Sequence, residues 1–521
     1  MKTRGLDLLR WPALLTFALL VPALLAGCTA GPSQRPAVVD NDEPSVTATT
    51  SAAPVPLPPL TDPQSPSVRW TDCDQDTRDH LDPPPVPDSL HFTCAGVQSV
   101  LDAPDLPGRV QTHIALLRAG DGPIPLVVLN DVDGEPGTLY AAHLAAVLPP
   151  ALLQRFSLIG MDRRGTGDSD PIGCVPTDVR GQLLGQDPAG SDVETVLDAA
   201  RRAGQQCAIE LGNTQQALDS WRTAGDLEQV RQALGVQKLN AIARGEASDV
   251  LTAYATRYAG RVGRVVLDGI PDPSPDPATL LGDLVTAQQA TLDAFGKDCA
   301  ARGCPLGGDA TGVVTALLQQ LRATPPTLAN GVPFDPGVAL NAVLYGLRDK
   351  ARWPELATAI QAARGGSVTP LAAFVAPLLN GSPLAPSRLD GALATLCNDT
   401  TARVSADKIT QLTGRLRARS ALFGGLVTQR LAWCLPWPGR VDGPTPLGAS
   451  GLPPILVTST AADPVTPEVG TTRATNQMSS AVGISWQGAG HGGLTSPCVA
   501  ETVRAFLVDG KVPAGGTLCP A

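Results

Sequence analysis

The chain has 521 residues, of which 43% are hydrophobic and 17% are charged, enough for a large core and more than one structural unit. Its formal net charge is −10 at pH 7 and its sequence pI is about 5.0, and basic residues form no run beyond the extreme N-terminus. This charge distribution excludes the basic surface that nucleic-acid binding needs.

The N-terminus has the pattern of an export signal. Basic residues at Lys2, Arg4 and Arg10 surround the start of an apolar run, Trp11 to Leu25, which is short for a membrane-spanning helix. The run ends in Leu-Ala-Gly-Cys28, which resembles a bacterial lipobox. We expect residues 1–27 to be a lipoprotein signal peptide, and a lipid on Cys28 to anchor the protein at the outer face of the bacterial cell membrane. Ordinary secretion with a chance cysteine is the alternative.

Ten cysteines remain besides Cys28, an even number that in an exported chain favours disulfides over metal or redox chemistry. Pairing of neighbours in sequence predicts Cys73–Cys94, Cys174–Cys207, Cys299–Cys304, Cys397–Cys434 and Cys498–Cys519. The five histidines are scattered along the chain, so we expect neither a zinc site nor any other cofactor.

Residues 28–66 are rich in Pro, Ser, Thr and Ala, so we expect a disordered tether there. From Trp70 onward strand and helix patterns alternate, which predicts an α/β fold whose mostly parallel sheet has helices on both faces. The predicted strands are Pro125–Asn130, Phe156–Gly160, Leu239–Ala243, Val262–Asp268, Ile455–Ser459 and residues 482–486. Helices are predicted from Thr223 to just before Gly235, over residues 250–258, and over Val499–Val508.

The strand pattern disappears between about residues 273 and 445. Amphipathic segments such as Leu280–Ala294, Val313–Leu321 and Leu340–Leu347 are separated there by Pro and Gly. We therefore expect a core in two parts, residues 67–272 and 446–521, with residues 273–445 inserted as a helical cap.

Three segments carry a family resemblance. Residues 160–169 contain D-x-R-G-x-G-x-S, residues 463–467 read D-P-V-T-P after a buried strand, and residues 488–492 read G-A-G-H-G after the next strand. Together they resemble α/β hydrolases of the tripeptidyl aminopeptidase and proline iminopeptidase type, including their TAP-like C-terminal segment, over nearly everything after Trp70. The resemblance implies a serine peptidase site with Asp463 as the acid and His491 as the base.

The nucleophile position is where the chain departs from this family. A G-x-S-x-G elbow is expected between the strand at Leu239 and the helix near Val250, but the chain reads A-R-G-E-A over residues 243–247. An ungapped alignment places Gly245 on the serine. Since the elbow residue has a strained backbone that glycine adopts without cost, the turn is expected to remain while its hydroxyl is lost.

The loop after the first core strand also differs from the family's sequence pattern. The family carries a glycine-rich H-G-G-P-G-like loop that helps form the oxyanion hole, whereas residues 130–137 here are N-D-V-D-G-E-P-G. The carboxylates of Asp131, Asp133 and Glu135 would oppose a developing oxyanion by several kcal/mol in a dry pocket. Their spacing fits no calcium loop closely, and a solvated acidic loop is as good an explanation as a ligand role.

These departures predict a pseudo-hydrolase, catalytically impaired, whose capped site binds a peptide or small envelope ligand without serine-type turnover. The alternative is an active peptidase or esterase that uses a displaced nucleophile, Ser248, or a water activated by Asp463 and His491 with help from Glu246. Ser248 lies about one turn into the following helix, where its hydroxyl is expected to point away from His491. A purely structural envelope lipoprotein is a third hypothesis.

Overall fold

The computed structural model describes residues 55–81, 85–103, 106–190, 192–382, 385–400, 403–438 and 447–521. Side chains of residues 102–109 are not part of this description. The expected signal peptide, and Cys28 with its expected lipid, lie outside the described residues. No helix in the described part of the chain is long and apolar enough to cross a membrane.

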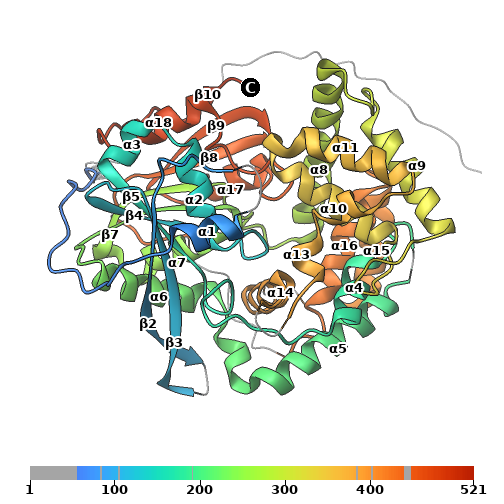
Figure 1. The fold of residues 1–521 in the computed structure, drawn as a ribbon, viewed down its shortest axis with the longest axis horizontal. Helices are drawn as coiled ribbons and strands as arrows, with labels where there is room; N and C mark the ends of the chain where they lie inside the picture. The colour runs from blue at the N-terminus through green and yellow to red at the C-terminus, as the bar shows by residue number, and fades with distance from the viewer. Residues whose placement is uncertain are drawn as a thin grey trace, which may run out of the picture. The chain divides into compact units, whose positions relative to one another are not determined.

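A twisted sheet forms the centre of the core (Figure 1). Its strand order is β1-β2-β3-β5-β4-β6-β7-β8-β9-β10, and every pairing from β5 to β10 is parallel. The strands are β1 (Thr71–Asp72), β2 (Phe92–Ala103), β3 (Leu106–Ala119), β4 (Ile124–Leu129), β5 (Phe156–Met161), β6 (Leu239–Arg244), β7 (Val262–Asp268), β8 (Ile455–Ala462), β9 (Ala481–Ala489) and β10 (Thr517–Cys519). All six predicted strands are confirmed, and the antiparallel pair β2–β3 is an addition to the prediction.

Helices cover both faces of this sheet, as predicted, because alternate strand residues face opposite sides. In β6, Ala241 and Ala243 pack with α6 (Ser220–Ala233), α7 (Ser248–Arg257) and α17 (Glu468–Gln477). Ile242 instead packs with α2 (Gly137–Val147), α3 (Pro150–Arg155) and α18 (Pro497–Leu507). A short helix, α1 (Asp74–His80), precedes β2. Helix α6 begins three residues before the predicted Thr223, because Asp219 caps it by accepting from the Arg222 backbone N–H.

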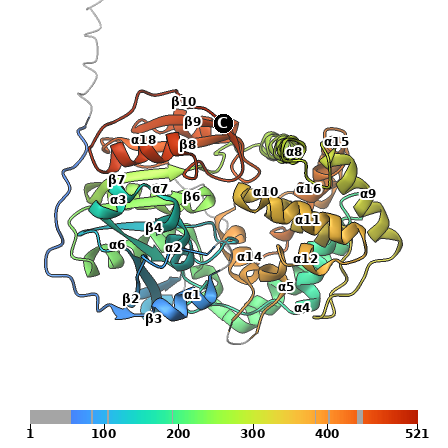
Figure 2. The same cartoon turned by 45° about the horizontal axis from the view of Figure 1, so that its top comes forward.

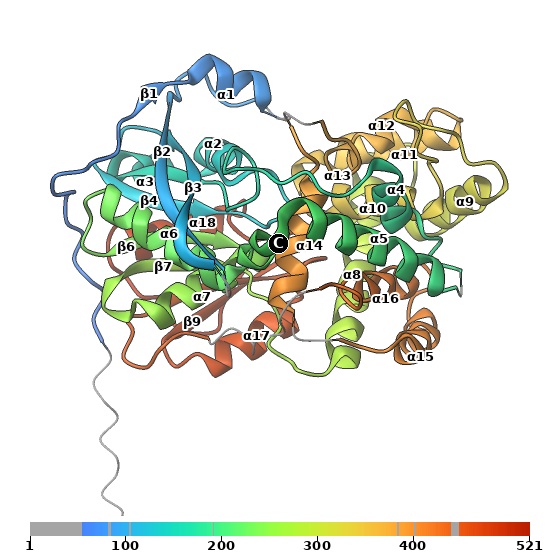
Figure 3. The ribbon, with the colours of Figure 1, turned by 90° about the horizontal axis from the view of Figure 1, so that it is seen from below.

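The cap is a separate helical layer beside the sheet (Figure 2). It contains α8 (Pro277–Arg302), α9 (Ala310–Ala323), α10 (Pro336–Arg348), α11 (Trp353–Arg364), α12 (Thr369–Ala372), α13 (Ala376–Leu379), α14 (Arg388–Asp399), α15 (Ala406–Arg417) and α16 (Phe423–Trp433). It also contains α4 (Thr177–Gly185) and α5 (Glu194–Leu211), which the sequence analysis assigned to the core. Both share the cap's hydrophobic core, and they lie beside α10, α14 and α16 in Figure 3. The cap is therefore built from two chain segments rather than one.

The end of the expected tether is folded. The Gln64 backbone N–H donates to the Gly235 carbonyl, and the Arg264 guanidinium donates to the Pro58 carbonyl at 3.1 Å. Leu57 and Leu60 pack on the core beside α18. The predicted boundary at residue 66 is thus at least nine residues too late, because Leu57 and the residues after it find partners that composition alone does not reveal.

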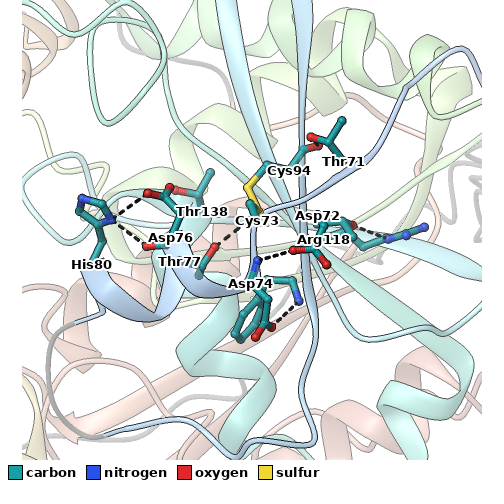
Figure 4. The surroundings of a disulfide bond; sticks show 12 residues. Thr71, Asp72, Cys73, Asp74, Asp76, Thr77, His80, Cys94, Arg118 and Thr138 are labelled. Atoms are coloured by element: carbon teal, nitrogen blue, oxygen red, sulfur yellow. Dashed lines mark hydrogen bonds and ion pairs between the residues drawn. A yellow bond between two sulfur atoms is a disulfide. The ribbon is translucent and has the colours of Figure 1, made fainter.

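All five predicted disulfides are confirmed. Figure 4 shows Cys73–Cys94, which joins the residue before α1 to β2. Three of the others, Cys174–Cys207, Cys299–Cys304 and Cys397–Cys434, lie in the helical layer, and Cys498–Cys519 ties α18 to β10.

Candidate active site

Four loops meet at the carboxyl edge of the parallel strands. β4 leads into residues 130–136, β6 into Gly245, β8 into Asp463 and β9 into His491. Because parallel strands present their carboxyl ends at one edge of a sheet, the topology brings these four positions together. Gly245, Asp463 and His491, which were named from the sequence, therefore lie at the same edge of the sheet.

The acid and the base form the predicted pair. His491 Nδ1 lies 3.0 Å from both carboxylate oxygens of Asp463. Asp463 Oδ1 also accepts from the backbone N–H groups of Val465 and Thr466, at 2.8 and 2.9 Å. The D-P-V-T-P loop therefore fixes the carboxylate, and the carboxylate fixes the imidazole, which is buried with it.

Gly245 occupies the elbow in the geometry that a nucleophile has. Its φ of +57° lies in the left-handed region, which glycine adopts without steric cost. A Cβ built on it would lie 2.7 Å from His491 Nε2 and closer still to Asp131 Oδ1. The turn is thus retained and aimed at the imidazole, as predicted, but the space that a serine side chain would need is filled.

The group that fills this space is the carboxylate of Asp131. Its Oδ2 lies 2.6 Å from His491 Nε2, and its Oδ1 accepts from the Glu246 backbone N–H at 2.7 Å. In this fold the N–H of the residue after the nucleophile belongs to the oxyanion hole. One carboxylate therefore bridges the general base and an oxyanion donor. From the sequence, Asp131 is predictable only as part of an acidic loop, because nothing in the sequence shows which of the three acids turns inward.

The two carboxylates determine the charge of His491. Burial alone would lower the pKa of its imidazole, but Asp463 and Asp131 together raise it to about 9. Burial acts in the opposite sense on Asp131 and Asp463, yet the cationic imidazole outweighs it and lowers the pKa of both carboxyls. At neutral pH the site is an imidazolium between two carboxylates, with no free base.

The other acids of the loop are paired as well. Asp133 accepts from both Nη atoms of Arg348 at 2.8 Å and from the Tyr345 hydroxyl at 2.5 Å, both on cap helix α10. Glu135 lies 2.8 Å from His143 Nδ1 on α2. The interpretation of a solvated acidic loop is therefore wrong. No group of three or more His, Cys, Asp or Glu in the described part of the chain has the geometry of a metal site.

Neither proposed substitute for the serine is in position. Ser248 is completely buried and donates its hydroxyl to the Gly269 carbonyl, away from His491 as expected. The Glu246 carboxylate is held by Arg163, at 2.6 Å, and accepts from the Val132 backbone N–H at 3.2 Å. Arg163 belongs to the D-x-R-G-x-G-x-S turn, so that turn neutralises the acid beside the elbow. The geometry therefore turns Ser248 away from His491 and commits the Glu246 carboxylate to Arg163 and Val132.

The strand order, the elbow after β6 and the Asp463–His491 pair define an α/β-hydrolase fold. Residues 420–519 match the family model described as TAP-like protein. The chain is 26% identical over 445 residues to serine protease Hip1 of Mycobacterium tuberculosis, covering 80% of this chain and 85% of that protein. It is also 26% identical to carboxylesterase B of the same organism, over 97% of both chains, and to tripeptidyl aminopeptidase of Streptomyces lividans, over 70% of both.

Among solved structures, an esterase from Thermogutta terrifontis aligns with a TM-score of 0.35 at 13% identity, over 79% of this chain and 98% of that one. The protein therefore has an α/β-hydrolase fold with a TAP-like segment, and its sequence is similar to those of these peptidases and esterases.

Proposed function

We propose that this protein is an exported, lipid-anchored pseudo-hydrolase, whose capped site binds a ligand without hydrolysing it. The observation that carries the proposal is the bridge that Asp131 makes between His491 and the Glu246 backbone N–H. The proposal therefore rests on an added carboxylate as well as on a missing hydroxyl.

Serine-type hydrolysis needs a nucleophile, a neutral imidazole and free oxyanion donors. Gly245 supplies no nucleophile. His491 Nε2, the atom that would take the proton, is already bound to Asp131. The Glu246 N–H points at a carboxylate, which would repel a developing oxyanion. Gly245 removes the first requirement and Asp131 removes the other two, so reversing either change alone leaves the site inactive.

Export and lipid anchoring rest on the sequence pattern around Cys28. The five disulfides support them, because disulfides persist in the oxidising compartments outside the cytoplasm. Mass spectrometry of the membrane-associated protein tests this part: we expect a chain that begins at lipid-modified Cys28, and an unmodified N-terminus at another residue would contradict it.

Covalent labelling by a fluorophosphonate probe tests the catalytic part. We expect no label on the wild type, and none on Gly245→Ser, because the new Cβ collides with Asp131. The double variant Gly245→Ser/Asp131→Ala removes the carboxylate as well, so the introduced serine faces a free imidazole and an open donor. We expect label on that serine in the double variant, and its loss when His491→Ala is added.

Label on any serine of the wild type would contradict the proposal. So would turnover of a tripeptide anilide or a nitrophenyl ester that disappears in both Asp131→Ala and His491→Ala, since that pattern would make the Asp131–His491 pair the catalyst. Failure of the double variant to react would show that the oxyanion loop is lost beyond Asp131.

A further inference from the structure

An arginine that makes no ion pair in the described part of the chain lies where the cap meets the loop at residues 130–136. Arg430, on α16, donates from Nη2 to the Asn341 side-chain oxygen at 2.8 Å, and its guanidinium stacks over Trp433 with 5.9 Å to the ring centroid. Within the described residues it makes no ion pair. Arg430 is partly exposed, but its Nε is buried and has no acceptor among the described residues, and a buried donor of this kind normally has a partner.

Arg430 belongs to the same surface as Tyr345 and Arg348, the two residues that hold Asp133. Its partner Asn341 shares one face of α10 with Tyr345 and Arg348, because positions i, i+4 and i+7 line up along a helix. Burial raises the pKa of the Asp133 carboxyl, but Arg348, Tyr345 and the more distant charge of Arg430 together lower it well below its ordinary value. The field of Arg430 thus reaches the loop that holds Asp131.

The groups on this surface have too few hydrogen-bond acceptors. Two guanidiniums, Arg348 and Arg430, face one carboxylate, Asp133, which both Nη atoms of Arg348 occupy. Three buried N–H donors have no acceptor in the described residues: Arg348 Nε, Arg430 Nε and Trp433 Nε1. Trp433 as a residue is only 6% exposed. One bound anion would satisfy these unmatched donors.

The loop beside this surface remains within reach of a ligand. Residues 132–136, Tyr345, Arg348 and Arg430 are all partly exposed, whereas Asp131 and His491 beneath them are buried. A ligand can therefore contact the arginines without displacing the Asp131–His491 bridge. This is the arrangement that binding without hydrolysis requires.

We propose that Arg430, assisted by Arg348, binds a carboxylate group of the ligand between α10, α16 and the loop at residues 132–136. A carboxylate fits the planar donor geometry of a guanidinium, and its single charge matches Arg430, which makes no ion pair among the described residues. The inference deepens the proposed function, on which it rests, by naming the ligand's chemistry. The carboxylate comes from a peptide C-terminus or from a fatty acid, and the experiment distinguishes the two.

Calorimetric titration of the purified chain at pH 7 tests the site with four probes. These are acetyl-trialanine with a free C-terminal carboxylate, its carboxamide, octanoate and octanamide. We expect one acid to bind, with its amide at least about tenfold weaker, because a charge-assisted hydrogen bond is lost. Arg430→Gln should lose the same factor and Arg430→Lys less. Arg364→Gln, which removes an equal charge from an exposed position on α11, should bind like the wild type.

The inference would be overturned by no binding of either acid, by equal binding of acid and amide, or by unchanged binding to a folded Arg430→Gln. Equal loss in Arg364→Gln would also overturn it, because the effect would then be one of net charge. The outcome is separable from the proposed function, since fluorophosphonate labelling of the wild type would end the pseudo-hydrolase proposal whatever the titration shows.

Discussion

The catalytic centre depends on how Gly245 and Asp131 share one small space. Glycine removes the Cβ that would collide with the carboxylate, and the carboxylate occupies the position that a serine side chain would take. The Asp131 carboxylate therefore fits only because residue 245 has no side chain, and a side chain at residue 245 would fit only if Asp131 were absent. This mutual dependence predicts that substitutions at the two positions are not additive.

A double-mutant cycle measures that coupling through the free energy of unfolding. We expect Gly245→Ser to destabilise the protein by about 3 kcal/mol, because a side chain at positive φ adds to the collision with Asp131. In the Asp131→Ala background the cost should fall to about 1–2 kcal/mol, because the collision with the carboxylate is gone while the backbone strain and the close approach to His491 Nε2 remain. Chemical denaturation supplies the measurement, and equal costs in both backgrounds would mean that Asp131 does not occupy the elbow.

At the scale of single elements, helix α10 holds both sides of the site. Its Arg348 and Tyr345 side chains fix Asp133, two residues from Asp131, and the Arg348 carbonyl accepts from the His491 backbone N–H at 2.8 Å. Since the Arg348 and Asp133 side chains are only 11% and 24% exposed, breaking their pair leaves a poorly solvated charge.

We therefore expect Asp133→Asn to lower the free energy of unfolding by about 3 kcal/mol. The matched control is Asp187→Asn, whose pair with Arg322 is 32% and 35% exposed and should contribute at most about 1 kcal/mol. Urea denaturation at pH 7 compares the two variants. If Asp187→Asn lowers the free energy of unfolding as much as Asp133→Asn does, the pair of Asp133 with Arg348 on α10 contributes no more than an exposed ion pair.

Local patterns predicted elements well and contacts between loops poorly. Strands β4 to β9 were predictable because their apolar runs are short and bounded by turn residues, and the elbow at Gly245 followed from the ungapped motif. The Asp131–His491 contact joins residues 360 positions apart. Which acid turns inward depends on the path of the loop, which α10 constrains through Asp133. The two-segment cap escaped prediction for a similar reason, because α4 and α5 have amphipathic patterns that fit a core as well as a cap.

At the scale of the whole folded region, the cap and the core also contact each other through buried carboxyl groups that lie near Glu246. Asp399, at the end of α14, accepts from the Ser220 backbone N–H and hydroxyl at the start of α6. Burial, and then the nearby charges of Asp219 and Glu246, raise the pKa of Asp399 to about 7, against the opposing charge of Arg163. Asp249, on α7, has a raised pKa for similar reasons and faces the same group of charges.

A raised carboxyl pKa makes the stability of this contact depend on pH. The folded state keeps the proton of Asp399 to about pH 7, whereas the unfolded chain releases it near 3.8, so its contribution is lost as pH rises between these values. Asp399→Asn cannot ionise. We expect the free energy of unfolding of the variant, relative to the wild type, to rise between about pH 4 and pH 7 and then level off. A difference that stays constant with pH would mean that Asp399 is ionised throughout.

The charge of His491 tests the central claim most directly, because the bridge to Asp131 requires an imidazolium. The chain has only five histidines, so a ¹H–¹³C NMR titration can follow each ring, with His491→Gln giving the assignment. We expect His491 in the wild type to remain protonated through neutral pH and to titrate with a pKa of about 9, and the pKa to fall in Asp131→Asn, which removes one of the two carboxylates that raise it. A neutral His491 at pH 7.5, or a His491 pKa that is unchanged by Asp131→Asn, would contradict the Asp131–His491 bridge on which the proposed function rests.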